Sequence, residues 1–140
     1  MHRTLRRRAV CRTLAAASLL AASALASCDT RTVTEPVFQP QVVVVPTEFA
    51  FQASALQNVS SANEYVWQSG AGSATVSQLP DNLRGDVSLV VLDGAGTQVY
   101  QHALTDTGTF TTAPGVAGTW TVRVRLNDAS GALTFRLTKP

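Results

Sequence analysis

Residues that bind metals or form disulfides are scarce in this sequence. Its 140 residues include only two cysteines and two histidines, so a structural zinc site would need Cys11, Cys28, His2 and His102 together. The chain also lacks a Gly-Xaa-Ser-Xaa-Gly segment and the lysine of a phosphate-binding loop. The common signatures of serine hydrolases and P-loop nucleotide-binding proteins are therefore excluded.

Charged residues are also few, and they are unevenly distributed. Five of the eleven lysines and arginines precede Cys28, whereas all nine acidic residues follow it. From Cys28 onward the chain has six basic and nine acidic residues, a net charge of −3. A mildly acidic domain has no basic stripe to neutralise phosphates. We therefore expect no nucleic-acid partner.

No apolar run reaches the roughly 20 residues that a membrane-spanning helix needs. The best candidate, residues 14–26, is short and rich in alanine. Five arginines precede it: Arg3, Arg6, Arg7, Arg8 and Arg12. A basic segment, a short apolar segment and small residues at a cleavage site are typical of a secretory signal peptide. We expect residues 1–27 to be removed on export, and a retained N-terminal helix is the alternative.

The end of this leader, Leu25-Ala26-Ser27-Cys28, resembles the lipobox of bacterial lipoproteins. The resemblance implies diacylglycerol on the Cys28 sulfur, cleavage before Cys28 and acylation of the new amino terminus. This covalent lipid is the only cofactor expected. It would hold the protein on a membrane of the cell envelope, on the periplasmic or surface side. Either export route, general or twin-arginine, and either membrane stay open. Loss of His2 and Cys11 with the leader would leave no disulfide and no zinc site.

The mature chain divides into a tether and one domain. Residues 29–41 are polar, contain Pro36 and Pro40, and show neither a helical nor a strand period. We predict a flexible tether over residues 28–46 and a folded domain over residues 47–140. The four valines at residues 42–45 are either the end of the tether or a short edge strand.

Beyond Pro46 the apolar residues recur with a period of two, which predicts antiparallel strands and no helix. In residues 119–126, Trp120, Val122, Val124 and Leu126 share one face. Residues 132–138 repeat the pattern, and residues 127–131 between them are a predicted hairpin loop. Further strands are predicted at residues 48–56, 64–68, 73–79, 87–92, 97–104 and 109–112. About eight short strands favour a single antiparallel β-sandwich, jelly-roll-like, with residues 87–92 central.

Several segments together resemble a known family. They are EYVW at residues 64–67, ATV at 74–76, DVSLVVLDGAG at 86–96 and GTWTVRV at 118–124. They look like the bacterial pre-peptidase C-terminal domain and are similar to the P-domain of proprotein convertases. The resemblance implies a jelly-roll-like β-sandwich that accompanies other proteins and is not itself catalytic.

Four aspartates at predicted strand ends are the candidate metal ligands. Asp86, Asp93, Asp106 and Asp128 could supply oxygen ligands to Ca²⁺, but their spacing matches no calcium loop. The favoured interpretation is solvated turn residues and no metal. Asp106-Thr107-Gly108 copies the aspartic-protease signature, yet only 32 residues follow it. It is therefore interpreted as a turn.

Aromatic residues are the candidate ligand-stacking groups. Trp67 and Trp120 lie on the apolar faces of their strands, which favours core packing over a sugar platform. Tyr100 shares its predicted face with Gln98 and His102, so it is the candidate exposed ring. His102 has no serine or cysteine nucleophile in a recognisable motif and is interpreted as an ordinary strand residue.

One local cluster of positive charge is predicted. If Leu126 pairs with Leu133 across the hairpin, Arg123 lies opposite Arg136, with Arg125 on the same outer face. Like charges placed opposite one another are destabilising unless an anion lies among them. Arg123, Arg125 and Arg136 are therefore candidates for binding an anion or a partner, and a carboxylate from a neighbouring strand is the alternative.

Together these patterns predict a lipid-anchored envelope protein that is a non-catalytic binding or structural module. Its expected partners are the membrane, through the lipid, and an envelope protein or glycan. A glycan-binding module is the alternative, and exposed aromatic rings around Tyr100 would distinguish it. A hydrolase comes third and would need two carboxylates in one pocket.

Overall fold

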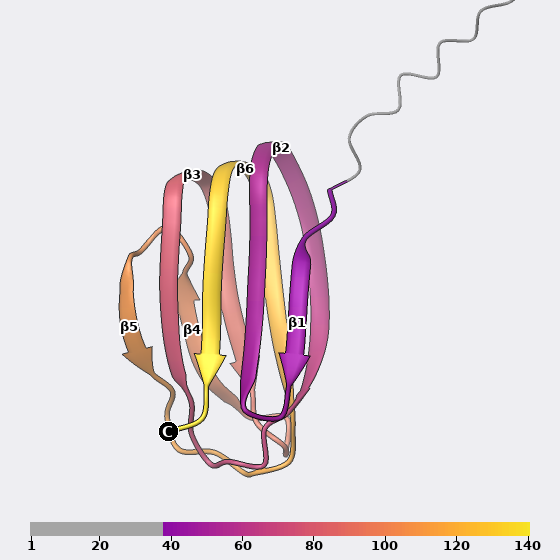
Figure 1. The fold of residues 1–140 in the computed structure, drawn as a ribbon, viewed down its shortest axis with the longest axis vertical. Helices are drawn as coiled ribbons and strands as arrows, with labels where there is room; N and C mark the ends of the chain where they lie inside the picture. The colour runs from indigo at the N-terminus through magenta and orange to yellow at the C-terminus, as the bar shows by residue number, and fades with distance from the viewer. Residues whose placement is uncertain (1–37) are drawn as a thin grey trace, which may run out of the picture. The chain divides into compact units, whose positions relative to one another are not determined.

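The computed structural model describes residues 38–140, which are all-β, without helices. Six strands form one antiparallel sheet: β1 (Gln41–Val45), β2 (Glu48–Gln68), β3 (Thr75–Leu92), β4 (Gln98–Ala103), β5 (Gly108–Thr111) and β6 (Thr119–Thr138). The strand order is β1-β2-β6-β3-β4, and β5 pairs with the beginning of β3 (Figure 1). Within these residues no helix is long and apolar enough to span a membrane. The predicted antiparallel all-β class is confirmed.

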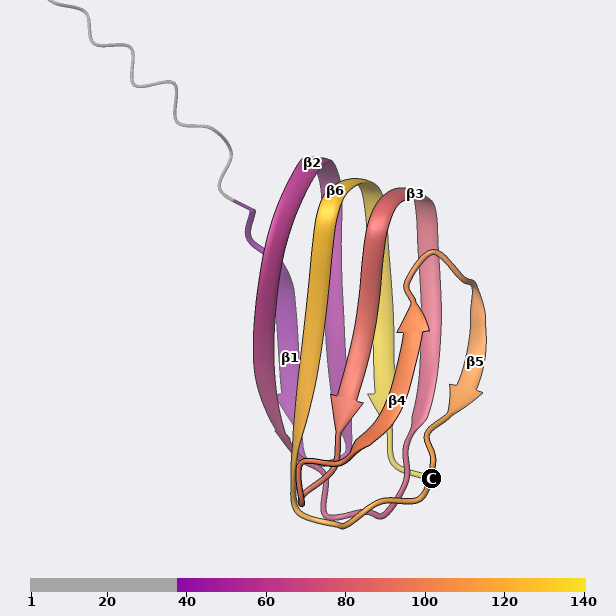
Figure 2. The same cartoon turned by 180° about the vertical axis from the view of Figure 1, so that it is seen from behind.

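The three long strands, β2, β3 and β6, each bend near the middle, and the sheet folds over on itself there (Figures 1 and 2). Each bend contains two residues with positive φ, three positions apart: Ala55 and Asn58, Asn82 and Gly85, Asp128 and Gly131. The pairing register shifts at the same places. Bulges of this kind bend a strand and increase its twist, so the three strands turn together.

The bends divide the sheet into two half-sheets that face each other across the core. The first half-sheet contains β1, β5 and residues 48–53, 75–81 and 132–138. The second contains β4 and residues 61–68, 86–92 and 119–127. Contacts link the two: the rings of Phe49 and Tyr65 lie 5.7 Å apart, and Trp67 Nε1 donates to the Val45 carbonyl at 2.9 Å.

The predicted hairpin loop at residues 127–131 is wrong, because this segment is the bend inside β6. Leu126 pairs with Ser61 of β2 and Val87 of β3, and not with Leu133. Two further pairs of predicted strands also join into single strands, β2 and β3. With β1 added at residues 41–45, the structure has six strands where the sequence suggested about eight. Hairpin turns and bulges both use Gly, Asn and Asp at positive φ, so local sequence does not separate them.

The predicted inward faces of residues 119–126 and 132–138 are confirmed. Trp120, Val122, Val124 and Leu126 are buried, and so are the alternate residues Leu133, Phe135 and Leu137. The two tryptophan rings pack edge to face with centroids 6.1 Å apart, and both are fully buried. The Trp120 indole also donates to the Val116 carbonyl at 2.9 Å. Both tryptophans therefore belong to the core, as the sequence indicated.

The folded part begins earlier than residue 47. Residues 41–45 are an edge strand, one of the two alternatives for the valine run, and pair with β2 through a turn at Pro46 and Thr47. Phe38 and Val42 pack against the core. The predictions for residues 1–27 and for Cys28 lie outside the described residues.

Two glycines allow the bends of neighbouring strands to lie in contact. A Cβ at Gly85, where φ is +105°, would come within 2.5 Å of the Asp128 carbonyl oxygen. A Cβ at Gly131, where φ is +117°, would come equally close to the carbonyl oxygen of Asn82. Both positions thus require glycine for backbone conformation and for space.

We expect Gly85→Ala to lower the free energy of unfolding by about 2 to 5 kcal/mol, because it adds backbone strain to a clash with β6. Gly96→Ala is the matched control: its φ is +81°, but no atom lies within 4 Å of the added Cβ. It should lose only about 1 to 2 kcal/mol. Chemical denaturation measures both, and equal losses would contradict the contact between bends.

Candidate functional site

Tyr100 is not an exposed ring, since its side chain is only 7% exposed. It pairs with Val91 and His102 pairs with Leu89, and both β3 residues face the core. The register shifts between Val91 and Leu92, which pairs with Gln98. Val99 is the extra residue, so this bulge breaks the alternation that placed Tyr100 on the outer face. The stacking prediction for Tyr100 is therefore wrong.

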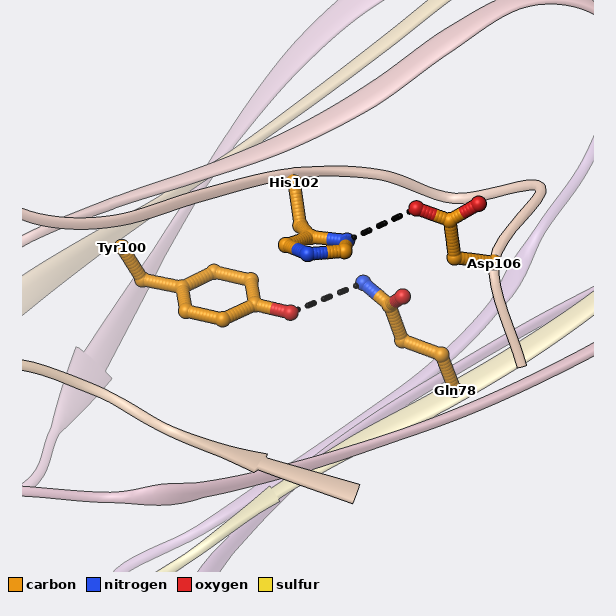
Figure 3. Close-up of polar contacts among 4 residues, drawn as sticks. All are labelled: Gln78, Tyr100, His102 and Asp106. Carbon is orange, nitrogen blue, oxygen red and sulfur yellow. Dashed lines mark hydrogen bonds and ion pairs between the residues drawn. The ribbon is translucent and has the colours of Figure 1, made fainter. Parts of the chain in front are cut away.

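Tyr100 belongs instead to a polar cluster with Gln78, His102 and Asp106 (Figure 3). The fully buried Gln78 amide lies 3.2 Å from the Tyr100 hydroxyl. With Nε2 turned toward the β4–β5 turn, the amide donates to the carbonyls of Asp106 at 3.0 Å and Ala103 at 3.3 Å, and Oε1 accepts from Tyr100. In this orientation both the nitrogen and the oxygen of the buried Gln78 amide have hydrogen-bond partners. Burial, and then the charge of Asp106, raises the pKa of Tyr100 to about 12, which keeps the phenol a donor.

His102 lies at the edge of this cluster and is in contact with Asp106. Its Nδ1 is 3.1 Å from Asp106 Oδ2, although the contact lacks hydrogen-bond geometry. The imidazole also packs on Phe110 of β5, with centroids 4.3 Å apart. His102 Nδ1 forms no hydrogen bond with a hydroxyl or thiol of residues 38–140. The cluster therefore connects β3, β4 and the β4–β5 turn.

Asp93 is the one buried carboxylate among residues 38–140. Its Oδ1 accepts from the N–H groups of Ala95 at 2.9 Å and Thr97 at 2.8 Å, and Oδ2 accepts from Val116 at 2.8 Å. These bonds, the one from Val116 first, hold the pKa of Asp93 below its ordinary value. Both carboxylate oxygens therefore hold loops in place: Oδ1 binds the β3–β4 turn, and Oδ2 binds the loop between β5 and β6.

The other three candidate calcium ligands lie elsewhere in the fold. Asp106 is in the β4–β5 turn, Asp128 is in the bend of β6, and Asp86 is exposed just after the bend of β3. No three carboxylate, histidine or cysteine side chains come together as metal ligands in the described part of the chain. Asp86 and Asp106 do line one open depression of about 470 Å³ together with His102, whereas Asp93 and Asp128 are not part of it.

Arg123 and Arg136 do not face each other, because the pairing that would place them opposite does not form. Arg123 lies on the second half-sheet, with Nε 2.6 Å from Glu64 Oε1 on β2. Arg136 lies on the first half-sheet, with a terminal nitrogen 3.6 Å from Glu48 Oε1. Carboxylates from the neighbouring strand therefore partner both arginines, which is the alternative that the sequence left open.

Arg125 remains without an acidic partner in residues 38–140, where none of the ion pairs involves it. Its register neighbours are Ala62 on β2 and Ser88 on β3. A shallow depression of about 510 Å³ surrounds it across four strands. We call this surface the arginine face, and its polar lining is Asn63, Glu64, Ser88, Gln101, Arg123 and Arg125.

The alternation in residues 119–126 correctly placed Arg123 and Arg125 on the outer side. Glu64 and Gln78 were not singled out, since a polar residue in an alternating strand is indistinguishable from an ordinary surface residue. Comparisons with protein-family models and with curated proteins find no match to this sequence. The arginine face is therefore identified by its geometry alone.

The lowered pKa of Asp93 predicts how stability depends on pH. The folded pKa lies below the unfolded value of about 3.9, so the stabilisation is present above that pH and is lost as the pH falls further. We expect Asp93→Asn to destabilise the domain at pH 7 and to reduce the loss on acidification. Asp81→Asn, on an exposed residue, is the control. Thermal unfolding between pH 3 and pH 7 measures both, and identical curves for the two variants would contradict the role of Asp93.

Proposed function

We propose that this protein is a lipid-anchored module of the bacterial cell envelope that binds an acidic partner and catalyses no reaction. The leader and the lipobox-like segment ending at Cys28 support the anchor. The two half-sheets facing each other across an aromatic core support a jelly-roll-like β-sandwich, similar to the pre-peptidase C-terminal domain. The arginine face is the observation that carries the binding role.

The arginine face suits an anionic group on a partner surface. Guanidinium groups hold carboxylate, sulfate or phosphate oxygens in two-point contacts. Glu64 pairs with Arg123, while Arg125 has the small neutral residues Ala62 and Ser88 as its register neighbours and forms no ion pair within residues 38–140. Every aromatic side chain in residues 38–140 is buried or half-buried, which gives a stacked sugar no exposed platform. An acidic protein segment is therefore the favoured partner, ahead of a glycan.

The use of the buried polar groups supports a non-catalytic role. In the described part of the chain these are Ser69, Gln78, Asp93 and Thr112. Ser69 Oγ accepts from the Ala71 N–H at 3.3 Å, and Thr112 Oγ1 accepts from the Ala74 N–H at 3.0 Å. Gln78 and Asp93 likewise bond to turns. All four stabilise loops, and the one buried side-chain polar atom of residues 38–140 left without a hydrogen bond is His102 Nδ1, which lies beside Asp106.

The anchor is tested by mass spectrometry of protein from membranes. We expect a mature chain that begins with an acylated Cys28. Cys28→Ser should stay unprocessed or become soluble, since each lost CH₂ removes about 0.8 kcal/mol of membrane affinity. Cys11→Ser is the matched control and should be lipidated normally. An unmodified Cys28 in the wild-type protein would contradict the anchor.

The arginine face is tested by retention on immobilised polyglutamate at low salt. We expect the double variant Arg123→Gln/Arg125→Gln to bind at least tenfold more weakly, with a flatter salt dependence. Arg84→Gln/Arg136→Gln removes the same charge from other parts of the surface and should keep most of the binding. Arg125→Gln should change the free energy of unfolding by less than about 1 kcal/mol. Equal losses for the two double variants would show that net charge alone is responsible.

A further inference from the structure

β1 is an edge strand with an unprotected backbone edge. It pairs with β2 on one side, and no other strand of residues 38–140 lies on its other side. Alternate residues of such a strand present N–H and C=O groups outward, and proteins commonly protect them with charges, prolines or bulges. Residues 41–45 contain no charge and no proline, and their register with β2 has no shift.

β1 is also exposed and apolar. Six large apolar residues are exposed in residues 38–140, and three of them, Val43, Val44 and Val45, are consecutive in β1. Their exposed fractions are 55%, 46% and 42%. Scattered single residues of this kind are ordinary, but a continuous run on a free strand edge is a site for strand addition.

The two faces of β1 show what a neighbouring strand would cover. Val42 packs against the core, and Val44 lies on the same face, with Phe49 as its register partner on β2. Phe49 is fully buried, whereas nearly half of Val44 is exposed. Val44 therefore faces the core side of the sheet but stays partly exposed, because no further strand lies beside β1 in residues 38–140.

We propose that β1 pairs in antiparallel register with β1 of a second copy of this chain, centred on Val43. In this register Val43 faces Val43, and Val42 of each copy faces Val44 of the other. The alternation of core and outer faces is kept, so each Val42 covers the exposed Val44 of its partner. This is the register in which all five residues of β1 in one copy lie opposite all five residues of β1 in the other.

Self-pairing fits the strand better than pairing with a different chain. The same five residues serve both partners, and the two-fold axis closes the assembly, so that no free edge of β1 remains. No charge in residues 41–45 opposes the pairing. Pro40 and Pro46 flank the strand and limit the ladder to these five residues.

The register is tested by oxidising full-length Val43→Cys protein in its own membranes. Opposed Cα atoms in an antiparallel pair lie about 4.5 to 5.5 Å apart, which suits a disulfide. We expect a covalent dimer of this chain. Val116→Cys is the matched control, because Val116 is also 55% exposed, and Val44→Cys lies out of register with itself. Both should cross-link at least fivefold less. The unsubstituted chain controls for Cys11 and Cys28.

Sedimentation of the detergent-solubilised protein tests the association itself. Val43→Lys places two like charges side by side at the two-fold axis and should weaken the dimer at least tenfold. Val116→Lys should leave it unchanged, and thermal unfolding verifies that both variants are folded. The proposal is overturned if Val43→Cys cross-links no better than Val116→Cys. It is equally overturned if Val43→Cys cross-links to a different protein, or if the unsubstituted chain is monomeric at every concentration.

Discussion

The paired bends of β2, β3 and β6 are the constraint on which the rest of the structure depends. Three hydrogen-bonded strands can fold over only if all of them turn at the same level, since otherwise their ladders would separate. Each strand meets this condition with two residues at positive φ, three positions apart. Gly85 and Gly131 allow the backbones to touch where the bends meet. Leu56 and Ala129 are buried within the same bends and extend the core to them.

The folded-over sheet has an outer surface on each half-sheet and an edge strand at each end of its strand order. The arginine face lies on the second half-sheet, where the bend in β6 has separated Arg123 and Arg125 from Arg136. The polar cluster of Gln78 and Tyr100 joins strands from different half-sheets. β1 lies at the edge of the first half-sheet. A partner on the arginine face and a second copy at β1 would therefore use different strands.

Local sequence predicted burial better than pairing. The alternation around Trp120 and Phe135 identified core residues correctly, because successive side chains of any strand point to opposite faces. It failed at Tyr100, where one bulged residue reverses the alternation. It also failed at residues 127–131, where the residues of a hairpin turn form a bend. At residues 127–131 the error follows from a positive-φ backbone conformation that hairpin turns and bulges share, whereas no turn residue marks the bulge at Val99.

The sequence by itself determined the all-β class, the inward faces of residues 119–126 and 132–138, and the outward direction of Arg123 and Arg125. These depend on composition and on a period of two, which are properties of a single strand. Only the tertiary structure decided that Glu64 pairs with Arg123, that the Asp93 carboxylate binds the N–H groups of its own turn, and that β1 is the edge strand of the sheet formed by residues 38–140. Such facts depend on which strands are neighbours and in what register. Residues far apart in the chain settle that together, through the shared bends and the common core.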